Sequence, residues 1–340
     1  LQPASPPPPA ARPAVTPVQR IRQLERFLLF DVIFHEQVNK QRRALMFYLD
    51  RAMRLKRTLV LPRMRLLRRE GGTHRFAPDA EYVDWGELFN VSRLSVLHPV
   101  IELDQYLELH GPLSLHVKID HKGCPEESGG EVAFNGLRVA AARSVCAAGW
   151  QYDLTALSGP EMASLESLAF SHSVDQLQMN QALVLRPHVC FADTTYDAAA
   201  AFVSQSFGDA PFIAIHWRRT DFLYARQTQA GVLQSAEDVI RHARTLMRKH
   251  GISKVYLATD SDDKRELAVV ESALQPARYR VDARTLRART DVANVEISIC
   301  AMAAHFLGTR TSSFTLAIGE ERSAIFGHAP STTADMAGLP

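Results

Sequence analysis

The chain has 340 residues, more than one hydrophobic core usually organises, so we expect two lobes of roughly 150 residues each. Its 46% hydrophobic and 22% charged residues are typical of a folded protein and exclude a disordered chain, a collagen and a coiled coil. The 39 basic and 37 acidic residues nearly cancel, which argues against nucleic-acid binding, and no apolar run reaches the roughly 18 residues of a membrane span. Four cysteines are too few for a disulfide scaffold and too irregularly spaced for a zinc site, which leaves one or two disulfides open.

The N-terminal segment, residues 1–22, is rich in proline and poor in large apolar residues. Such a stretch cannot bury surface, so we expect a disordered, extended linker. The chain begins with Leu1 rather than Met, which indicates that an upstream segment, such as a signal or a membrane anchor, has been removed. An ordinary disordered terminus is the alternative.

The next region, residues 23–200, is predicted to form the N-terminal lobe. Its first elements are a strand over residues 27–34, a helix over 39–57 and a strand over 58–62. Residues 40–69 hold eleven Lys or Arg and one acid, which indicates a solvated basic face or a surface for an acidic partner. The pattern also predicts a loop over residues 120–135 and a hinge within residues 190–210.

Residues 201–330 are predicted to form the C-terminal lobe. A strand over 211–216, a helix that begins at the capping box of Ser235 and Asp238, and a strand over 254–260 make a β-α-β unit, which favours a parallel sheet. The following elements complete a Rossmann-like lobe: a strand over 278–283, a helix over 292–304, a strand over 305–309 and a helix from Ser313. Residues 331–340 are expected to be a tail.

Two arginines follow the first strand of this lobe, at the edge where such sheets bind ligands. Asp221 can hold one guanidinium, of Arg218 or Arg219, which leaves the other free to bind an oxyanion bidentately without a metal. A purely structural ion pair is the alternative.

Small hydroxyl residues, Ser312 and Ser313 among them, connect the last strand to the last helix. The helix N-terminus there is a candidate anion site, although such residues are also ordinary caps. Glu296 lies on the preceding helix and can accept hydrogen bonds from the N1–H and amino groups of guanine, unless it is a surface side chain. No GxGxxG or Walker motif is present, which excludes a classical dinucleotide site and a P-loop kinase.

Together the segments resemble a known family. HWRRTDF (216–222), YLATDS (256–261), FLGTRTSSFTLAIGEER (306–322) and, in the N-terminal lobe, HEQVNKQRRAL (35–45) are similar in order and spacing to the signature segments of GDP-fucose protein O-fucosyltransferases. The resemblance covers roughly residues 27–110 and 205–327. It is strongest to the type that modifies thrombospondin repeats and to the plant O-fucosyltransferase-like proteins.

The resemblance implies an α/β GT-B fold, with two Rossmann-like lobes facing across a cleft. It also implies inverting transfer of fucose from GDP-fucose to a Ser or Thr hydroxyl of a protein, without a cofactor or an essential metal. Glu36 would be the catalytic base, and Arg218 would neutralise the leaving diphosphate as a catalytic residue. The matching donor-binding positions are Asn39, His216, Trp217, Arg218, Asp221, Asp260, Glu296, Ser312, Ser313 and Phe314.

Two positions depart from the family pattern. Gln37-Val38 replaces a glycine that lets the backbone approach the pyrophosphate, and Glu296 stands where relatives carry Asp. The first departure keeps a non-catalytic GDP-sugar-binding pseudoenzyme open as an alternative, and a glycan-directed α1,6 or α1,2 fucosyltransferase is another.

The resemblance also bears on partners and location. The expected partners are GDP-fucose and a protein or glycan acceptor, with a small disulfide-rich module as one acceptor class, and we expect a monomer. The family implies the lumen of the endoplasmic reticulum or Golgi, and the glycosylation pattern Asn90-Val91-Ser92 agrees with it.

Overall fold

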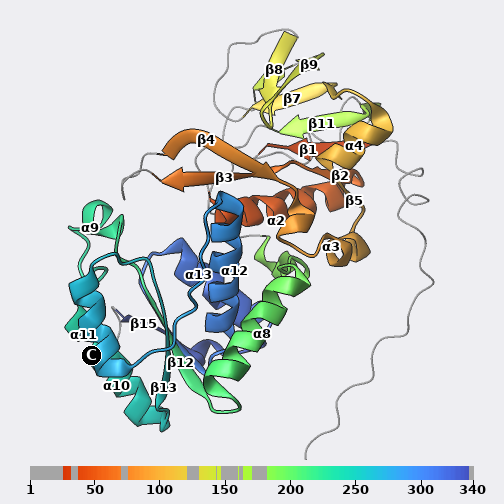
Figure 1. The fold of residues 1–340 in the computed structure, drawn as a ribbon. Helices are drawn as coiled ribbons and strands as arrows, with labels where there is room; N and C mark the ends of the chain where they lie inside the picture. The colour runs from red at the N-terminus through yellow and green to blue at the C-terminus, as the bar shows by residue number, and fades with distance from the viewer. Residues whose placement is uncertain are drawn as a thin grey trace, which may run out of the picture.

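The structure is a computed structural model that describes residues 26–31, 37–69, 76–120, 130–142, 144–146, 160, 164–170 and 182–336 (Figure 1). The expected linker, residues 1–22, and the expected base, Glu36, lie outside these described residues. No helix within them is long and apolar enough to cross a membrane. Two of the four cysteines, Cys190 and Cys300, are buried free thiols.

The N-terminal lobe is built on a six-stranded sheet in the order β10-β7-β11-β1-β2-β5, in which every pairing is parallel. Its strands are β1 (Phe27–Phe30), β2 (Thr58–Leu61), β5 (Val100–Glu102), β7 (Val117–Asp120), β10 (Ser144–Cys146) and β11 (Ser167–Phe170). The central strands β1, β2 and β11 are buried along their whole length, as expected for a parallel sheet that is covered on both faces. Among the described residues of this lobe, the helices are α2 (Val38–Leu55), α3 (Val91–Leu97), α4 (Leu103–His110) and the short 3₁₀ turn η1 (Trp85–Glu87).

Two smaller β elements flank this sheet. One is the antiparallel hairpin of β3 (Met64–Arg69) and β4 (Phe76–Val83), and the other is a three-stranded sheet of β6 (Ser114–Leu115), β9 (Leu137–Ala141) and β8 (Gly130–Phe134). The prediction of a loop over 120–135 is therefore wrong for residues 130–134. Asn135 and Gly136 both have positive φ (48° and 77°), so they form the Asn-Gly hairpin turn that pairs β8 with β9.

The C-terminal lobe contains a second parallel sheet, in the order β13-β12-β14-β15. Its strands are β12 (Phe212–Trp217), β13 (Lys254–Thr259), β14 (His305–Gly308) and β15 (Thr333–Asp335). The helices beside it are α8 (Asp193–Phe207), α9 (Phe222–Ala225), α10 (Ala236–His250), α11 (Lys264–Leu274), α12 (Leu286–Met302) and α13 (Ser313–Ala324), with the 3₁₀ turn η3 (Pro330–Thr332). A further 3₁₀ turn, η2 (Leu183–His188), contacts both α2 and α13. Most of the stretch 190–210, which was predicted to hold a hinge, is the continuous helix α8. The capping box of Ser235 and Asp238 starts α10, which confirms the prediction, and Gly251 ends it in the left-handed conformation.

Three expectations for this lobe are corrected. The stretch 278–283 is not a strand, because Arg278 and Arg280 both turn to Glu271 and Val281 is exposed. Helix α12 begins at Leu286, six residues earlier than expected. Part of the expected tail, residues 333–335, forms the edge strand β15.

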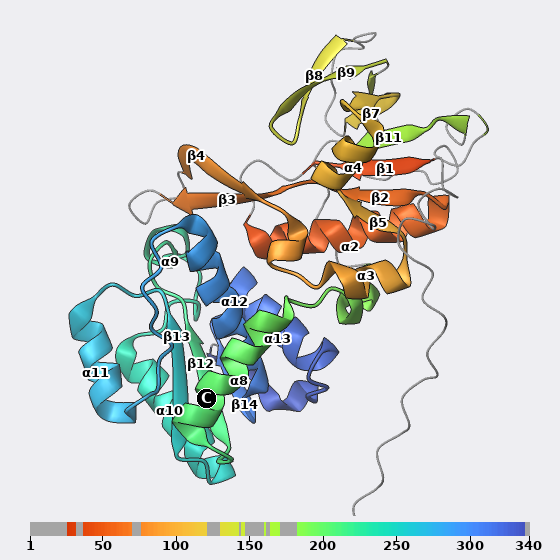
Figure 2. The ribbon, with the colours of Figure 1, turned by 45° about the vertical axis from the view of Figure 1, so that its right-hand side comes forward.

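One hydrophobic core extends across both lobes, and each lobe has a further cluster of its own. A single cluster of buried side chains includes residues of both sheets, for example Leu28 and Leu59 from one and Ala214 and Phe306 from the other. Figure 2 shows α2 and β3 lying against the ends of α12 and α13, where the lobes meet. This contact places the amino end of α2 beside the amino end of α13.

Candidate donor-binding site

A cavity of about 470 Å³ lies between the lobes. The N-terminal lobe contributes the start of α2 and the strand β3, and the C-terminal lobe contributes the ends of β12 and β13, one face of α12 and the start of α13. Arg218, Asp260 and Phe314 line it on one side and Asn39 on the other. Four of the predicted donor-binding residues, which are far apart in sequence, therefore meet at one site.

The end of β12 carries His216 and Trp217, whose side chains point to opposite faces of the sheet. The His216 Nδ1 atom is 2.7 Å from the Thr315 Oγ1 atom, and its ring lies 4.7 Å from the ring of Phe314, which lines the cavity. Burial, with Arg218 nearby, lowers the pKa of His216 to about 3, so the imidazole is neutral. His216 thus supports the wall of the cavity.

Trp217 does not line the donor site, contrary to expectation. Its ring is completely buried on the far face of the sheet, and its Nε1 atom donates to the Gln234 carbonyl oxygen at 3.0 Å. The alternation of side chains along a strand explains the difference, because neighbours of a residue that faces the cleft must face away from it.

The Arg218 guanidinium is held by two aspartates. Its Nε and Nη2 atoms lie 2.9 Å and 2.7 Å from the Asp221 Oδ1 atom, and its Nη1 atom lies 2.9 Å from the Asp260 Oδ2 atom. These contacts use three of the five N–H groups of arginine, so one N–H on each terminal nitrogen remains for a ligand. Arg218 lines the cavity with its side chain 22% exposed.

The second arginine of the motif has a structural partner. Arg219 donates from Nε to the Glu266 Oε2 atom at 3.0 Å, and its backbone N–H donates to the Asp260 Oδ1 atom at 2.7 Å. The sequence predicted that Asp221 would hold one arginine and leave the other free. Instead both arginines are paired, and Arg218 is the one that reaches the cavity.

The loop between β14 and α13 is closely packed against β12. Thr309 donates to the His216 carbonyl oxygen and accepts from the Arg218 backbone N–H, both at 2.9 Å. Gly308 is required at the strand end, because a Cβ atom there would lie 2.3 Å from the Thr315 Cγ2 atom. Thr311 has a φ of 62°, an unfavourable conformation for a β-branched residue that typically costs about 1–3 kcal/mol.

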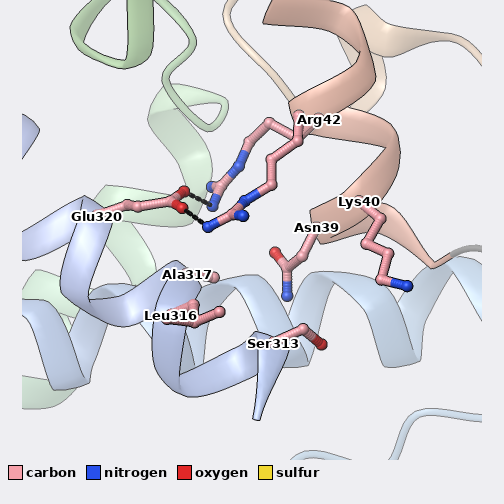
Figure 3. A pocket seen from close by; sticks show the side chains of 8 residues that line it. Asn39, Lys40, Arg42, Ser313, Leu316, Ala317 and Glu320 are labelled. Atoms are coloured by element: carbon pink, nitrogen blue, oxygen red, sulfur yellow. Dashed lines mark hydrogen bonds and ion pairs between the residues drawn. The ribbon is translucent and has the colours of Figure 1, made fainter. Parts of the chain in front are cut away.

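Ser312 and Ser313 begin α13. Ser312 is buried at the N-cap position without a side-chain capping bond, and Ser313 is exposed. Ser313 lines a small pocket of about 30 Å³ that it shares with Asn39 and Lys40 at the start of α2 (Figure 3). Two helix N-termini and a lysine therefore converge here, which is favourable for an anion.

The same pocket is also lined by Arg42, Arg43 and Glu320, so arginines of α2 pair with a glutamate of α13 at its wall. Glu320 is bonded to Arg42, at 3.4 Å, and to Arg43 (Figure 3). The deeper Glu321 is bonded to Arg186 and accepts from the Tyr196 hydroxyl at 2.5 Å.

These pairs correct the view of residues 40–69 as a solvated basic face. Arg42, Arg43 and Arg57 are buried, and Arg57 bonds three backbone carbonyl oxygens, including that of Leu165 at 2.9 Å. These three arginines therefore connect elements inside the protein, whereas Arg54 is exposed and pairs with Asp50 on its own helix.

Glu296 lies beside the cavity rather than among its lining residues. The Tyr256 hydroxyl donates to its Oε1 atom at 3.2 Å. Burial raises the pKa of Glu296 to about 7. Its role in reading guanine stays a prediction.

Sequence reasoning missed Asn294. It is 2% exposed and lines the cavity, and its Nδ2 atom has no hydrogen-bond partner. The Asn39 Oδ1 atom is likewise buried without a partner. The signal that could have found Asn294 is its helical spacing from Thr290 and Ile297, which line the same cavity.

The expected base, Glu36, lies outside the described residues, but the two residues that follow it, Gln37 and Val38, line the cavity. Among the residues that the structure describes, no group of three or more His, Cys, Asp or Glu side chains could hold a metal ion.

Comparison with known proteins agrees with the predicted family. The family model for GDP-fucose protein O-fucosyltransferase matches residues 37–325. The chain is 37% identical to GDP-fucose protein O-fucosyltransferase 2 of Caenorhabditis elegans over 126 residues, and 34% identical to that of Homo sapiens over 125 residues. Each match covers 36% of this chain and 28% of the relative, so the aligned part spans little more than a quarter of the relatives' length.

Solved structures show the same fold. The crystal structure of POFUT1 in complex with GDP has a TM-score of 0.68 at 17% identity and covers 93% of this chain and 99% of its own. POFUT1 in complex with GDP-fucose has a TM-score of 0.67 at 15% identity, with coverage of 93% and 98%. The architecture is thus the predicted GT-B fold. From its fold and from the match over residues 37–325, the chain belongs to the GDP-fucose protein O-fucosyltransferase family.

Proposed function

We propose that this protein is an inverting transferase that moves fucose from GDP-fucose to a Ser or Thr hydroxyl of a protein. The observation that carries the proposal is Arg218, which lines the interlobe cavity and retains two N–H groups beyond its bonds to Asp221 and Asp260. A planar fork of this kind fits two oxygens of a diphosphate.

The leaving group is stabilised by charge and by helix ends. Arg218 lies at the end of β12, and Ser313 and Phe314 begin α13. GDP leaves with a developing negative charge, and preorganised donors lower its energy in the transition state. Lys40, which lines the pocket that Ser313 shares, adds a second cation. We propose that these groups replace a metal ion.

The acceptor hydroxyl needs a base, because a Ser or Thr oxygen is a poor nucleophile while it keeps its proton. Glu36 directly precedes Gln37, which lines the cavity from the lobe opposite Arg218. An attack on the face of the sugar away from the diphosphate inverts the anomeric carbon, and Glu36 would take the proton on that face. Asn39, His216, Asp221, Asp260 and Glu296 complete the proposed donor site.

A GDP-sugar-binding protein without transferase activity is the second candidate. The feature that favours it is Gln37-Val38, whose side chains line the cavity at a position where the family has glycine. A third candidate is transfer to a glycan. We propose a location in the secretory pathway, where this family acts, and a small disulfide-rich module as the acceptor class.

The test is turnover of GDP-fucose by the purified protein. An enzyme releases GDP, slowly by hydrolysis and faster with an acceptor, whereas the non-catalytic alternative binds GDP-fucose without releasing GDP. Folded protein modules and free glycans tested in parallel separate protein-directed from glycan-directed transfer. GDP release that only glycans stimulate would contradict the proposed acceptor.

A further inference from the structure

Asn294 is a buried polar side chain that the mechanism above does not use. It lies on α12, is 2% exposed and lines the interlobe cavity. Its Nδ2 atom has no hydrogen-bond partner. A buried donor without a partner is unfavourable, so a residue of this kind is expected where a ligand supplies the missing acceptor.

The position of Asn294 on α12 indicates which part of the donor it meets. The cavity face of α12 contains residues spaced at three and four, among them Thr290, Ala293 and Ile297. Asn294 and Glu296 are two residues apart, which is roughly 200° around a helix of 3.6 residues per turn. Their side chains therefore leave α12 on opposite sides of the helix, Asn294 into the cavity and Glu296 toward Tyr256 of β13.

We propose that Asn294 binds a hydroxyl group of the sugar that is transferred and so contributes to the choice of sugar. The proposal rests on the proposed function, in which Glu296 receives the guanine base. The base and the sugar are opposite ends of a nucleotide sugar, so a side chain on the side away from Glu296 faces the sugar end. A sugar hydroxyl both donates and accepts, so it can satisfy the buried amide.

Asn39 supports this position. It lines the same cavity from the other lobe, and its Oδ1 atom is also buried without a partner. It projects from α2 toward the start of α13, where Ser313 lies (Figure 3). A sugar bound between the two lobes would contact the Asn39 amide from one lobe and the Asn294 amide from the other. Its hydroxyl groups would then give both unpartnered atoms a hydrogen bond.

The experiment is calorimetry with GDP and with GDP-fucose, in the absence of acceptor, on the wild type, Asn294→Ala and Asn294→Leu. We expect both variants to keep the wild-type affinity for GDP and to lose about tenfold in affinity for GDP-fucose, the effect of one hydrogen bond. Asn294→Leu is similar in size to asparagine and removes the unsatisfied donor, so its thermal stability should equal or exceed that of the wild type. A purely structural role for Asn294 predicts a loss of stability instead.

Thr290→Val is the matched control. Thr290 lines the same face of α12, and its hydroxyl already donates to the Leu286 carbonyl oxygen at 3.0 Å, so its loss should leave the ratio of the two affinities unchanged. An unchanged ratio in both Asn294 variants, or an equal loss for both ligands, would overturn the proposal while the proposed function stands. A wild-type protein that binds neither ligand would overturn the proposed function, and this inference with it.

Discussion

Arg218 and Asp260 form an ion pair across the ends of β12 and β13, with the Arg218 Nη1 atom 2.9 Å from the Asp260 Oδ2 atom. Asp260 also accepts from the Thr220 hydroxyl and from the Arg219 backbone N–H. Asp260 therefore fixes the turn that follows β12 and the direction of the guanidinium together. The arginine is oriented for a ligand before the ligand arrives, which reduces the entropic cost of binding.

Arg218→Lys should abolish transfer and weaken GDP binding, because an ammonium group cannot bond both aspartates and two phosphate oxygens in the same plane. We expect a loss of roughly 2–5 kcal/mol of transition-state stabilisation, measured as kcat/KM for GDP-fucose. Arg219→Lys is the control, since Arg219 bonds Glu266 and does not line the cavity. Near-normal turnover of the Arg218 variant would remove this residue from the mechanism.

Glu36→Gln should preserve GDP affinity and lower kcat by about 10²–10⁴-fold, because the missing base acts only while the acceptor proton moves. If Glu36 were instead paired with Arg42 or Arg43, the variant would change the stability of the protein and leave kcat intact. Both arginines already pair with Glu320, which argues against that role. Single-turnover transfer and the GDP dissociation constant, measured together, decide between the two. Full transfer by the variant means that another group accepts the proton.

Glu296 should make GDP binding depend on pH. Burial raises its pKa to about 7, and only the carboxylate accepts both guanine donors, so affinity should rise as pH increases through 7. Between pH 6 and pH 8 we expect a roughly tenfold gain, which calorimetry detects. In Glu296→Gln the preference for GDP over UDP and ADP should fall. The roughly tenfold rise of GDP affinity between pH 6 and pH 8 should disappear as well. An unaltered nucleotide preference in the Glu296 variant would mean that guanine binds elsewhere.

The same raised pKa has a consequence for stability. The folded state binds the Glu296 proton more tightly than the unfolded state, so the free energy of unfolding should decrease as pH rises from 4.5 to 7. In Glu296→Gln the free energy of unfolding should decrease less between pH 5 and pH 8 than in the wild type. Unfolding of both proteins in urea at these two pH values measures the difference.

Gly308→Ala should destabilise the protein by roughly 1–3 kcal/mol, because its Cβ atom would lie 2.3 Å from the Thr315 Cγ2 atom. Thr315 bonds His216, so donor affinity should fall as well. Gly319→Ala is the control on α13, where a Cβ atom meets nothing within 4 Å and a gain of roughly 0.5–1 kcal/mol is expected. Equal effects in urea unfolding would contradict the packing at the end of β14.

Glu320→Gln should destabilise the contact between the lobes by roughly 3 kcal/mol, because Arg42 and Arg43 would lose a buried counter-charge. Glu131→Gln removes a partner from an exposed pair with Arg138 and should cost at most about 1 kcal/mol. Thermal unfolding of both variants measures the difference, and similar midpoints would show that the interlobe pairs are not important for stability.

The sequence predicted the C-terminal lobe well because its signals are local. Strand β12, the capping box at Ser235 and the helix from Ser313 each follow from a short apolar run or a cap, and the structure has all three. The segments that form the site follow strands of one parallel sheet. They could be predicted because the carboxyl ends of such strands lie at the same edge of the sheet.

The errors came from side-chain partners that a local pattern does not show. Arg42 reads as a surface cation until Glu320 and Glu321 on α13 are known to surround it. The stretch 278–283 alternates like a strand, but its arginines turn to Glu271. Asn294 has no motif, and its burial at the cavity follows only from the packing of the two lobes.

We propose that fucose is transferred to a protein hydroxyl in the interlobe cavity. The most direct test incubates the protein with GDP-fucose and a panel of small folded modules, disulfide-rich ones included, and weighs each module by intact mass spectrometry. We expect at least one module to gain the mass of a single deoxyhexose on Ser or Thr, and we expect Arg218→Lys to abolish this gain. Tight binding of GDP-fucose with no module modified, or a gain that the Arg218 variant retains, would contradict the proposal.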